Sequence, residues 1–260
     1  MPKFAANLTT MYQEFPIPDR FATAAADGFT AVEFLKPYDY SVEEIRSWLQ
    51  QSGLTLILIN TPPAVAGDNT IGLSALPGRE ADFQQTFTQS LRYAQALGAS
   101  NIHVLAGVTK GYSETAVEQT LLKNLSWAAD LAAAADINLM LEPLNTQDVP
   151  GYAYTSSKEV VRLIRTLDKS NIKLQYDFYH MQIMEGNLTR HVARYFDHIG
   201  HIQFSSVPGR HEPQYGEVNL PYLFRYLDDM GYDGWIGCEY SAKTTTREGL
   251  GWLTGEYSTC

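Results

Sequence analysis

Short apolar, β-rich runs alternate with longer helical patterns along this chain, and this alternation constrains the fold more than any other feature. Eight runs can be counted: Phe4–Leu8, Ala31–Leu35, Leu54–Asn60, Asn101–Leu105, Ile137–Glu142, Ile172–Asp177, His201–Phe204 and Trp235–Glu239. Strands that alternate with helices favour βα units around a parallel sheet, and eight such units close a barrel. The sequence therefore predicts an α/β fold, a (β/α)8 TIM barrel.

The segments between these runs have the lengths and the ends of helices. We expect helices over Asp19–Ala26, Ser41–Gln51, Glu80–Leu97, Glu114–Ala135, Ser156–Leu167 and Pro221–Met230. Ser41 and Glu44 match a capping box, and Gly98 directly after Leu97 fits a helix C-terminus. Because no low-complexity tract or charge block marks a linker, we expect one domain over residues 1–260.

One stretch departs from this pattern. Residues Thr61–Gly78 carry three prolines and three glycines, so they predict a long loop after the third strand. Loops longer than about 12–15 residues inside compact domains are usually functional or disordered. We expect a lid or an oligomer contact there, with a simple surface excursion as the alternative.

The charge balance bears on partners. Lysine and arginine total 19 against 29 aspartates and glutamates, which gives a formal net charge of −10 and a sequence pI near 5.0. Nucleic acid is therefore an unfavourable partner. A homo-oligomer of so acidic a chain would have to overcome repulsion through apolar patches.

The sequence also bears on the compartment. The N-terminal residues lack a signal-peptide pattern, and no apolar run approaches the roughly 18 residues that a membrane helix needs. The two cysteines, Cys238 and Cys260, form neither a disulfide framework nor a zinc cluster. We therefore expect a cytoplasmic protein that is not bound to a membrane.

Polar residues end the last four predicted strands. They are Glu142, Asp177, Gln203 and Glu239, spaced by about one βα unit each. In a barrel, the carboxyl ends of the strands converge on one mouth. Any one of these residues could simply bond to a loop backbone, but four at equivalent positions favour a shared site.

Three carboxylates and one amide oxygen around a common axis would repel one another without a cation between them. Hard oxygen ligands suit Mg²⁺ or Mn²⁺ better than zinc, which favours nitrogen and sulfur. Such an ion would leave positions where a hydroxy-carbonyl acid could chelate, and it would stabilise an enediolate. Glu142 and Glu239, on strands five and eight, are then the candidate proton acceptor and donor, in an order that the sequence leaves open.

Three more residues are candidates for substrate binding. His180 follows Asp177 by three residues, and we expect it in a loop, donating to a substrate oxygen. The planar guanidinium of Arg210 suits a substrate carboxylate. Lys243 is a second, weaker candidate for that carboxylate, since an exposed lysine is by default a solvated surface group.

Several longer segments carry a resemblance to a known family. They are Phe4-Ala5-Ala6-Asn7-Leu8, Ala31-Val32-Glu33-Phe34-Leu35, Gly72-Leu73-Ser74-Ala75-Leu76-Pro77-Gly78-Arg79-Glu80, Gly186-Asn187-Leu188-Thr189, Arg210-His211-Glu212-Pro213 and Gly234-Trp235-Ile236-Gly237-Cys238-Glu239-Tyr240. With these segments the chain resembles, over nearly its whole length, the hydroxypyruvate isomerase family within the xylose-isomerase-like group. The resemblance implies a TIM barrel with a magnesium-type ion on Glu142, Asp177, Gln203 and Glu239, and with the two glutamates as proton donor and acceptor.

The resemblance also implies a substrate class. Members of this family interconvert hydroxypyruvate and tartronate semialdehyde, and very similar proteins act on 2-oxo-tetronate, which is one carbon longer. Related ketose 3-epimerases usually have a histidine where Gln203 stands, which disfavours epimerisation here.

Two other classes of function remain as alternatives. A multi-metal barrel nuclease would need more histidines than the six present, of which His191, His198 and His201 are expected away from the mouth. The intact set of four candidate ligands disfavours a barrel that binds a sugar acid without turnover, although such a protein would still bind manganese and substrate. Titrating metal while assaying product distinguishes that reading from an isomerase.

Overall fold

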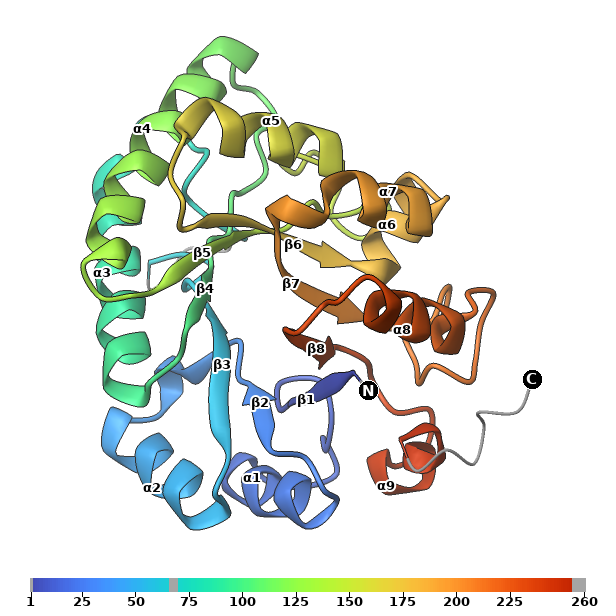
Figure 1. Ribbon diagram of the computed structural model, residues 1–260. Helices are drawn as coiled ribbons and strands as arrows, with labels where there is room; N and C mark the ends of the chain where they lie inside the picture. Colours follow the sequence, from blue (N-terminus) through green and yellow to red (C-terminus); the bar gives the residue numbers. More distant parts are fainter. Residues whose placement is uncertain (1, 66–69, 254–260) are drawn as a thin grey trace.

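Eight parallel strands close into a barrel in chain order, β1-β2-β3-β4-β5-β6-β7-β8, with β8 pairing back onto β1 (Figure 1). The structure is a computed structural model and describes residues 2–65 and 70–253. The strands are β1 Lys3–Asn7, β2 Ala31–Glu33, β3 Thr55–Asn60, β4 Asn101–His103, β5 Asn138–Leu141, β6 Ile172–Asp177, β7 Ile199–Phe204 and β8 Trp235–Cys238. The predicted (β/α)8 barrel and all eight predicted strands are thereby confirmed.

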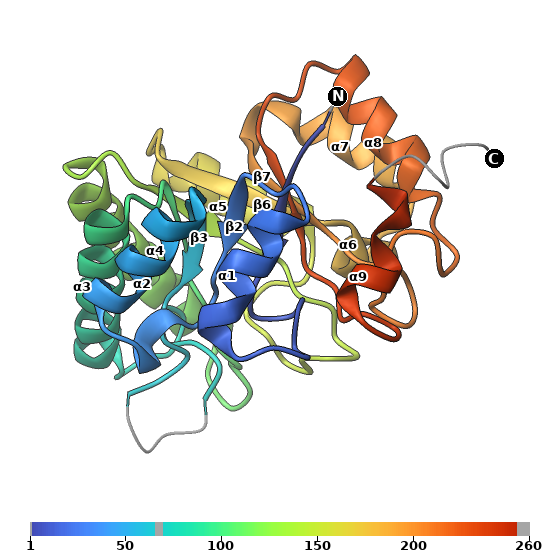
Figure 2. The same cartoon turned by 90° about the horizontal axis from the view of Figure 1, so that it is seen from below.

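Helices surround the barrel as an outer layer (Figures 1 and 2). They are α1 Ile17–Ala26, α2 Val42–Ser52, α3 Glu80–Leu97, α4 Glu114–Ala133, α5 Ser157–Leu167, α6 Phe178–Met184, α7 Leu188–Tyr195, α8 Leu220–Asp229 and α9 Thr246–Gly249, with three short 3₁₀ turns, Pro37–Asp39, Phe196–His198 and Leu250–Trp252. All six predicted helices are present. The capping box between Ser41 and Glu44 is formed, and Gly98 ends α3 in a left-handed conformation.

One prediction about local structure is wrong. His180 was expected in a loop after the sixth strand, but it lies in the short helix α6. The Asp177 side chain accepts a hydrogen bond from the backbone N–H of Tyr179, so the last residue of β6 is also the N-cap of α6. The strand therefore passes into a helix without a loop between them.

Residues 66–69 of the loop after β3 lie outside the described residues, and so does Cys260. The parts of this loop before and after residues 66–69 both pack on the end of β4. The backbone N–H of Gly72 donates to Pro63 at 2.6 Å, and Gly72 forms an isolated bridge with Ala106. Gly72 has a φ of +125°, and a Cβ there would lie 2.6 Å from the nitrogen of Gly107, so this contact requires glycine. A role for the loop as a lid or an oligomer contact stays a prediction.

The apolar core fills the space between the barrel and its helices, whereas part of the barrel interior is polar. Asn7, Glu33, Asp177 and Gln203 are all fully buried on the strands. In Figure 2 the loops that follow the strands gather at the bottom, opposite the N-terminus at the top. Strand ends and loops therefore meet at one mouth. Over residues 2–65 and 70–253, no helix is long and apolar enough to cross a membrane.

Candidate active site

The four predicted ligands come from consecutive strands at the mouth. Glu142 directly follows β5, Asp177 ends β6, Gln203 lies in β7, and Glu239 directly follows β8. Asp177 is the register partner of Gln203 on the neighbouring strand. Asp177 and Gln203 are fully buried, Glu142 is 4 % exposed, and the Glu239 side chain is 13 % exposed. The closed barrel thus brings these residues to one side of the molecule.

Two of the carboxylates meet a histidine at a point where a metal ion could bind. One ligand atom each from Glu142, Asp177 and His180 lie within 4.8 Å of one another, and all three residues are buried. Oε1 of Glu142 and Oδ2 of Asp177 have no hydrogen-bond partner among the described residues. Buried carboxylate oxygens without donors are costly, so these two atoms fit a cation as their missing partner.

The electrostatics of the carboxylates also fit a cation. Burial raises the pKa of Asp177 to about 6, against the lowering effect of Arg210. Burial likewise raises the pKa of Glu239 to about 8, again against Arg210 and with Asp177 adding to the rise. The pKa of Glu142 lies well above its usual value because of burial and of the nearby Glu239 and Asp177. The carboxylates repel one another, and a divalent ion between them would relieve that repulsion.

His180 is held as a neutral donor. The backbone N–H of Asn145 donates to its Nδ1 at 3.2 Å, so in the neutral ring the proton sits on Nε2. Nε2 lies 3.7 Å from Oδ2 of Asp177. Burial, together with the charge of Arg210, lowers the pKa of His180 to about 3, which keeps the ring neutral. The N–H of His180 is therefore available to an oxygen atom in the mouth.

Arg210 lies between two of the carboxylates. Its Nη2 is 4.0 Å from Oδ2 of Asp177 and 3.6 Å from Oε1 of Glu239. The guanidinium stacks over the ring of Tyr179, 4.5 Å from its centroid, and the backbone carbonyl accepts from the N–H of Ser241. Burial lowers the pKa of Arg210, but the carboxylates outweigh this effect and raise it overall. The guanidinium of Arg210 is thus fixed in orientation beside the carboxylates.

Lys243 is placed differently. It is exposed, and its ammonium lies 4.4 Å from the ring centroid of Tyr215. Its backbone N–H is 3.2 Å from both carboxylate oxygens of the buried Glu212. The structure therefore gathers His180 and Arg210 with the carboxylates, while the contacts of Lys243 are with Tyr215 and Glu212.

Sequence reasoning missed a second set of buried polar residues. Glu33, Gln175 and His201 lie inside the barrel, where His201 bonds to Glu33 and Gln175 donates to Gln203. On β4, Nδ1 of the buried His103 lies 3.4 Å from Oε2 of Glu142. Two of these residues could have been found from the sequence, because residues two apart on a strand face the same side of the sheet. His201 therefore faces the same side as Gln203, and Gln175 faces the same side as Asp177.

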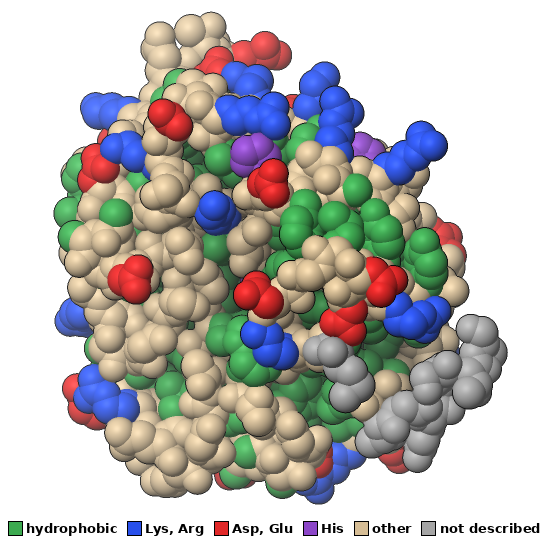
Figure 3. All heavy atoms as spheres, in the orientation of Figure 1, with side chains coloured by type: hydrophobic (Ala, Val, Ile, Leu, Met, Phe, Trp, Pro, Cys, Tyr) green, Lys and Arg blue, Asp and Glu red, His purple; other side chains and the backbone are tan. Residues whose placement is uncertain are grey.

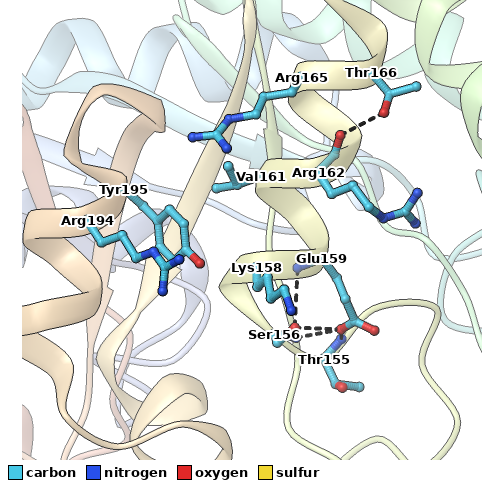
Figure 4. A pocket seen from close by; sticks show the side chains of 10 residues that line it. All are labelled: Thr155, Ser156, Lys158, Glu159, Val161, Arg162, Arg165, Thr166, Arg194 and Tyr195. Atoms are coloured by element: carbon cyan, nitrogen blue, oxygen red, sulfur yellow. Dashed lines mark hydrogen bonds between the residues drawn. The ribbon is translucent and has the colours of Figure 1, made fainter.

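A separate basic hollow lies on the outside of the barrel between α5 and α7, with a volume of about 880 Å³ (Figure 4). Its described lining includes Lys158, Arg162, Arg165 and Arg194 but none of the seven predicted site residues. Figure 3 shows lysine and arginine side chains gathered over these two helices. This basic hollow is thus distinct from the carboxylate site.

Solved structures share this architecture. A structure described as an AP endonuclease of family 2 from Brucella melitensis has a TM-score of 0.95 and 43% sequence identity, covering 99% of each chain. A D-psicose 3-epimerase from Clostridium cellulolyticum H10 has a TM-score of 0.78 at 20% identity, covering 96% of this chain and 90% of that one. At that identity the epimerase shows a common fold only.

Curated relatives cover nearly the full length. A 2-oxo-tetronate isomerase from Cupriavidus necator is 48% identical over 97% of this chain and 98% of its own. A hydroxypyruvate isomerase from Escherichia coli K12 is 41% identical with the same coverage of both chains. The model of the xylose isomerase-like TIM barrel family matches residues 21–255. The chain therefore belongs to the xylose isomerase-like TIM barrel family, and within it to the isomerases related to hydroxypyruvate isomerase and 2-oxo-tetronate isomerase.

Proposed function

We propose that the protein is a metal-dependent isomerase that interconverts hydroxypyruvate and tartronate semialdehyde. The observation that carries this proposal is the buried cluster of Glu142, Asp177 and His180, with two carboxylate oxygens that lack donors among the described residues. Nη2 of Arg210 lies 4.0 Å from Oδ2 of Asp177 and 3.6 Å from Oε1 of Glu239, so Glu239 adds a third carboxylate beside the cluster. The carboxylates and the histidine are thus held close together at the mouth of the barrel.

Glu142, Asp177, Gln203 and Glu239 would hold one Mg²⁺ or Mn²⁺ ion. Their oxygen atoms are hard ligands, and the two orphaned carboxylate oxygens point to a cation as partner. When bound, the ion would polarise the carbonyl and hydroxyl oxygens of the substrate and acidify the adjacent C–H. His180 stays a donor in this scheme, because its Nδ1 is occupied by Asn145.

The side chains of this chain would divide the remaining tasks. Arg210 would bind the substrate carboxylate with its planar fork, and the Nε2 proton of His180 would bind a neighbouring oxygen. Glu142 and Glu239 would then remove a proton from the hydroxymethyl carbon and deliver one to the carbonyl carbon. The hydroxyl proton passes to the former carbonyl oxygen, so the isomer forms without net gain or loss of atoms. Lys243 remains a second candidate for the carboxylate.

2-Oxo-tetronate is a second candidate substrate. Relatives from Cupriavidus necator and Pectobacterium atrosepticum, at 48% and 43% identity, are named 2-oxo-tetronate isomerases. Both acids carry the same carboxylate and 2-oxo group, so Arg210 serves either one. Epimerisation of a ketose is a weaker alternative, because those epimerases usually have a histidine at the position of Gln203.

A nuclease activity, suggested by the description of the Brucella melitensis structure, is disfavoured by charge. The net charge of −10 opposes binding of a polyanion. A small monoanionic acid needs only one cation such as Arg210 beside the site. We therefore place the substrate among short sugar acids.

The proposal is tested with metal-stripped protein, reloaded with Mn²⁺ or Mg²⁺ and incubated with hydroxypyruvate in deuterated water. NMR follows proton loss and aldehyde formation. Metal-dependent conversion with solvent deuterium in the product supports proton transfer through acid and base groups, whereas conversion without deuterium indicates a shielded proton or a hydride shift. If hydroxypyruvate is not converted while 2-oxo-tetronate is, the second substrate is correct, and conversion of neither acid refutes the proposal.

A further inference from the structure

A fully buried carboxylate contacts Gln203, one of the proposed ligands, and takes no part in the chemistry described so far. Glu33 ends β2 inside the barrel with no exposed surface. Its Oε2 accepts hydrogen bonds from Asn7 at 2.8 Å and from Nε2 of Gln203 at 2.9 Å, and its Oε1 bonds to His201. Burying a carboxylate costs folding free energy unless hydrogen-bond donors surround it. The three side chains that converge on Glu33 offset this cost.

Glu33 fixes which end of the Gln203 amide points where. Oε2 of Glu33 accepts, so the group of Gln203 that faces Glu33 is its NH₂. The amide oxygen of Gln203 then faces the other way, where Nε2 of Gln175 donates to it. A flipped Gln203 amide would set its oxygen against the Glu33 carboxylate, whereas Gln175 could turn its own amide and accept with Oε1, which has no hydrogen-bond partner among the described residues. Glu33 is therefore the neighbour that specifies the orientation.

This orientation matters for a cation at the mouth. Gln203 is the register partner of Asp177, so the two side chains leave neighbouring strands at the same level of the barrel. A carbonyl oxygen has two lone pairs, so one can accept from Gln175 while the second remains for a metal ion. The nitrogen has no lone pair to offer. Only the orientation that Glu33 imposes would let Gln203 bind a cation.

The backbone of β8 is shaped to leave room for this arrangement. Gly237 is the register partner of Gln203, and a Cβ built on it would overlap Oε1 of Glu33 and lie 2.8 Å from Cγ of Gln203. Any side chain at this position would displace both residues. Glycine here is explained by the Glu33–Gln203 contact, since the φ of Gly237 is not in the left-handed region.

We propose that Glu33 is a positioning residue that orients the Gln203 amide so that its oxygen, not its nitrogen, faces the metal site. This inference rests on the proposed metal dependence. Residues that orient metal ligands typically contribute about 10- to 100-fold in metal affinity. Glu33 would thus act on metal binding through Gln203 and touch neither metal nor substrate.

The test measures Mn²⁺ binding by isothermal titration and by electron paramagnetic resonance, with thermal unfolding of each variant recorded in parallel. Glu33→Gln keeps the shape but lets the amide at position 203 turn, and it should weaken Mn²⁺ binding about 10- to 100-fold. Glu33→Asp keeps the charge and draws it away from Gln203, and a loss of about threefold or more is expected. Glu185→Gln is the matched control, because Glu185 binds Ser157 on the outer helices and its replacement should leave Mn²⁺ affinity unchanged.

A rescue separates positioning from a general loss of structure. In the double variant E33Q/Q203E the new carboxylate at position 203 presents oxygen in any orientation and accepts from the amide at position 33. Mn²⁺ affinity should recover to within a few-fold of the wild type. Unchanged affinity in both Glu33 variants, or a double variant no better than Glu33→Gln, overturns the positioning role. Failure of the wild type to bind Mn²⁺ would instead refute the proposed metal dependence on which the inference rests.

Discussion

Nη2 of Arg210 lies 3.6 Å from Oε1 of Glu239, and the same guanidinium stacks on Tyr179. The arginine is oriented by its ring contact and by backbone bonds on both sides: its N–H donates to Ser206, and its carbonyl accepts from Ser241. A cation fixed beside the proposed acid and base groups can bind a substrate carboxylate without first being ordered. The geometry thus favours Arg210 over Lys243, whose ammonium lies over Tyr215.

Replacing Arg210 should mainly weaken substrate binding. Arg210→Ala should raise KM about 10-fold or more, the scale of one charge-assisted hydrogen bond, with a smaller effect on kcat. Steady-state kinetics with hydroxypyruvate and with 2-oxo-tetronate measure both constants. Lys243→Ala is the comparison, because the ammonium of Lys243 lies over Tyr215 and its loss should change KM less. A larger rise in KM for Lys243→Ala would assign the carboxylate to Lys243 instead.

Removing either proposed proton carrier should suppress turnover. Glu142→Gln and Glu239→Gln should each lower kcat by at least about 10²-fold, the usual scale for a positioned acid or base. Both changes keep the shape of the side chain, so the circular dichroism spectrum should match that of the wild type. Glu118→Gln serves as control, because the half-exposed Glu118 on α4 pairs with Arg162 of α5 and not with any proposed site residue. Near-normal activity in either active-site variant would remove that glutamate from the mechanism.

The fold and the positions of the proposed ligands along the strands were predictable from the sequence because both follow from periodicity. Eight apolar runs separated by helical segments leave few alternatives to a closed barrel, and all eight strands are present. Glu142 and Glu239 end such runs, and parallel strands point the same way. Their convergence therefore requires only the topology.

Other features depend on contacts that no local pattern encodes. Glu33 looks like one polar residue in a short strand, and its role appears only when the barrel closes and sets it against Gln203. The helical position of His180 depends on the cap that Asp177 supplies, which a reading of strand ends alone does not reveal. The ammonium of Lys243 lies over Tyr215, a pairing across two loops that sequence spacing does not predict.

Removing the metal should make stability depend on pH. In the metal-free protein the pKa of Asp177 is raised to about 6 and that of Glu239 to about 8, so the folded state holds protons that the unfolded state has released. These groups favour folding below about pH 4, and their contribution is lost as pH rises toward 8. Below about pH 6.5 the lowered pKa of His180 acts in the opposite direction, because the unfolded chain then binds a proton that the folded state does not. The melting temperature with EDTA should therefore fall from about pH 6.5 to 8, and Mn²⁺ should reduce that fall. Parallel curves with and without Mn²⁺ would argue against a cation at these carboxylates.

A methyl group on Gly237 should disturb the metal site without touching any proposed ligand oxygen. Gly237→Ala would place its Cβ against Oε1 of Glu33 and 2.8 Å from Cγ of Gln203, so both side chains must shift. Mn²⁺ affinity should fall about 10-fold or more, together with the melting temperature. Gly28→Ala is the control: its φ of +96° strains the backbone, but its Cβ meets nothing within 4 Å, so stability should fall while Mn²⁺ affinity stays. Equal affinities for the Gly237→Ala variant and the wild type would show that the Glu33–Gln203 contact does not govern metal binding.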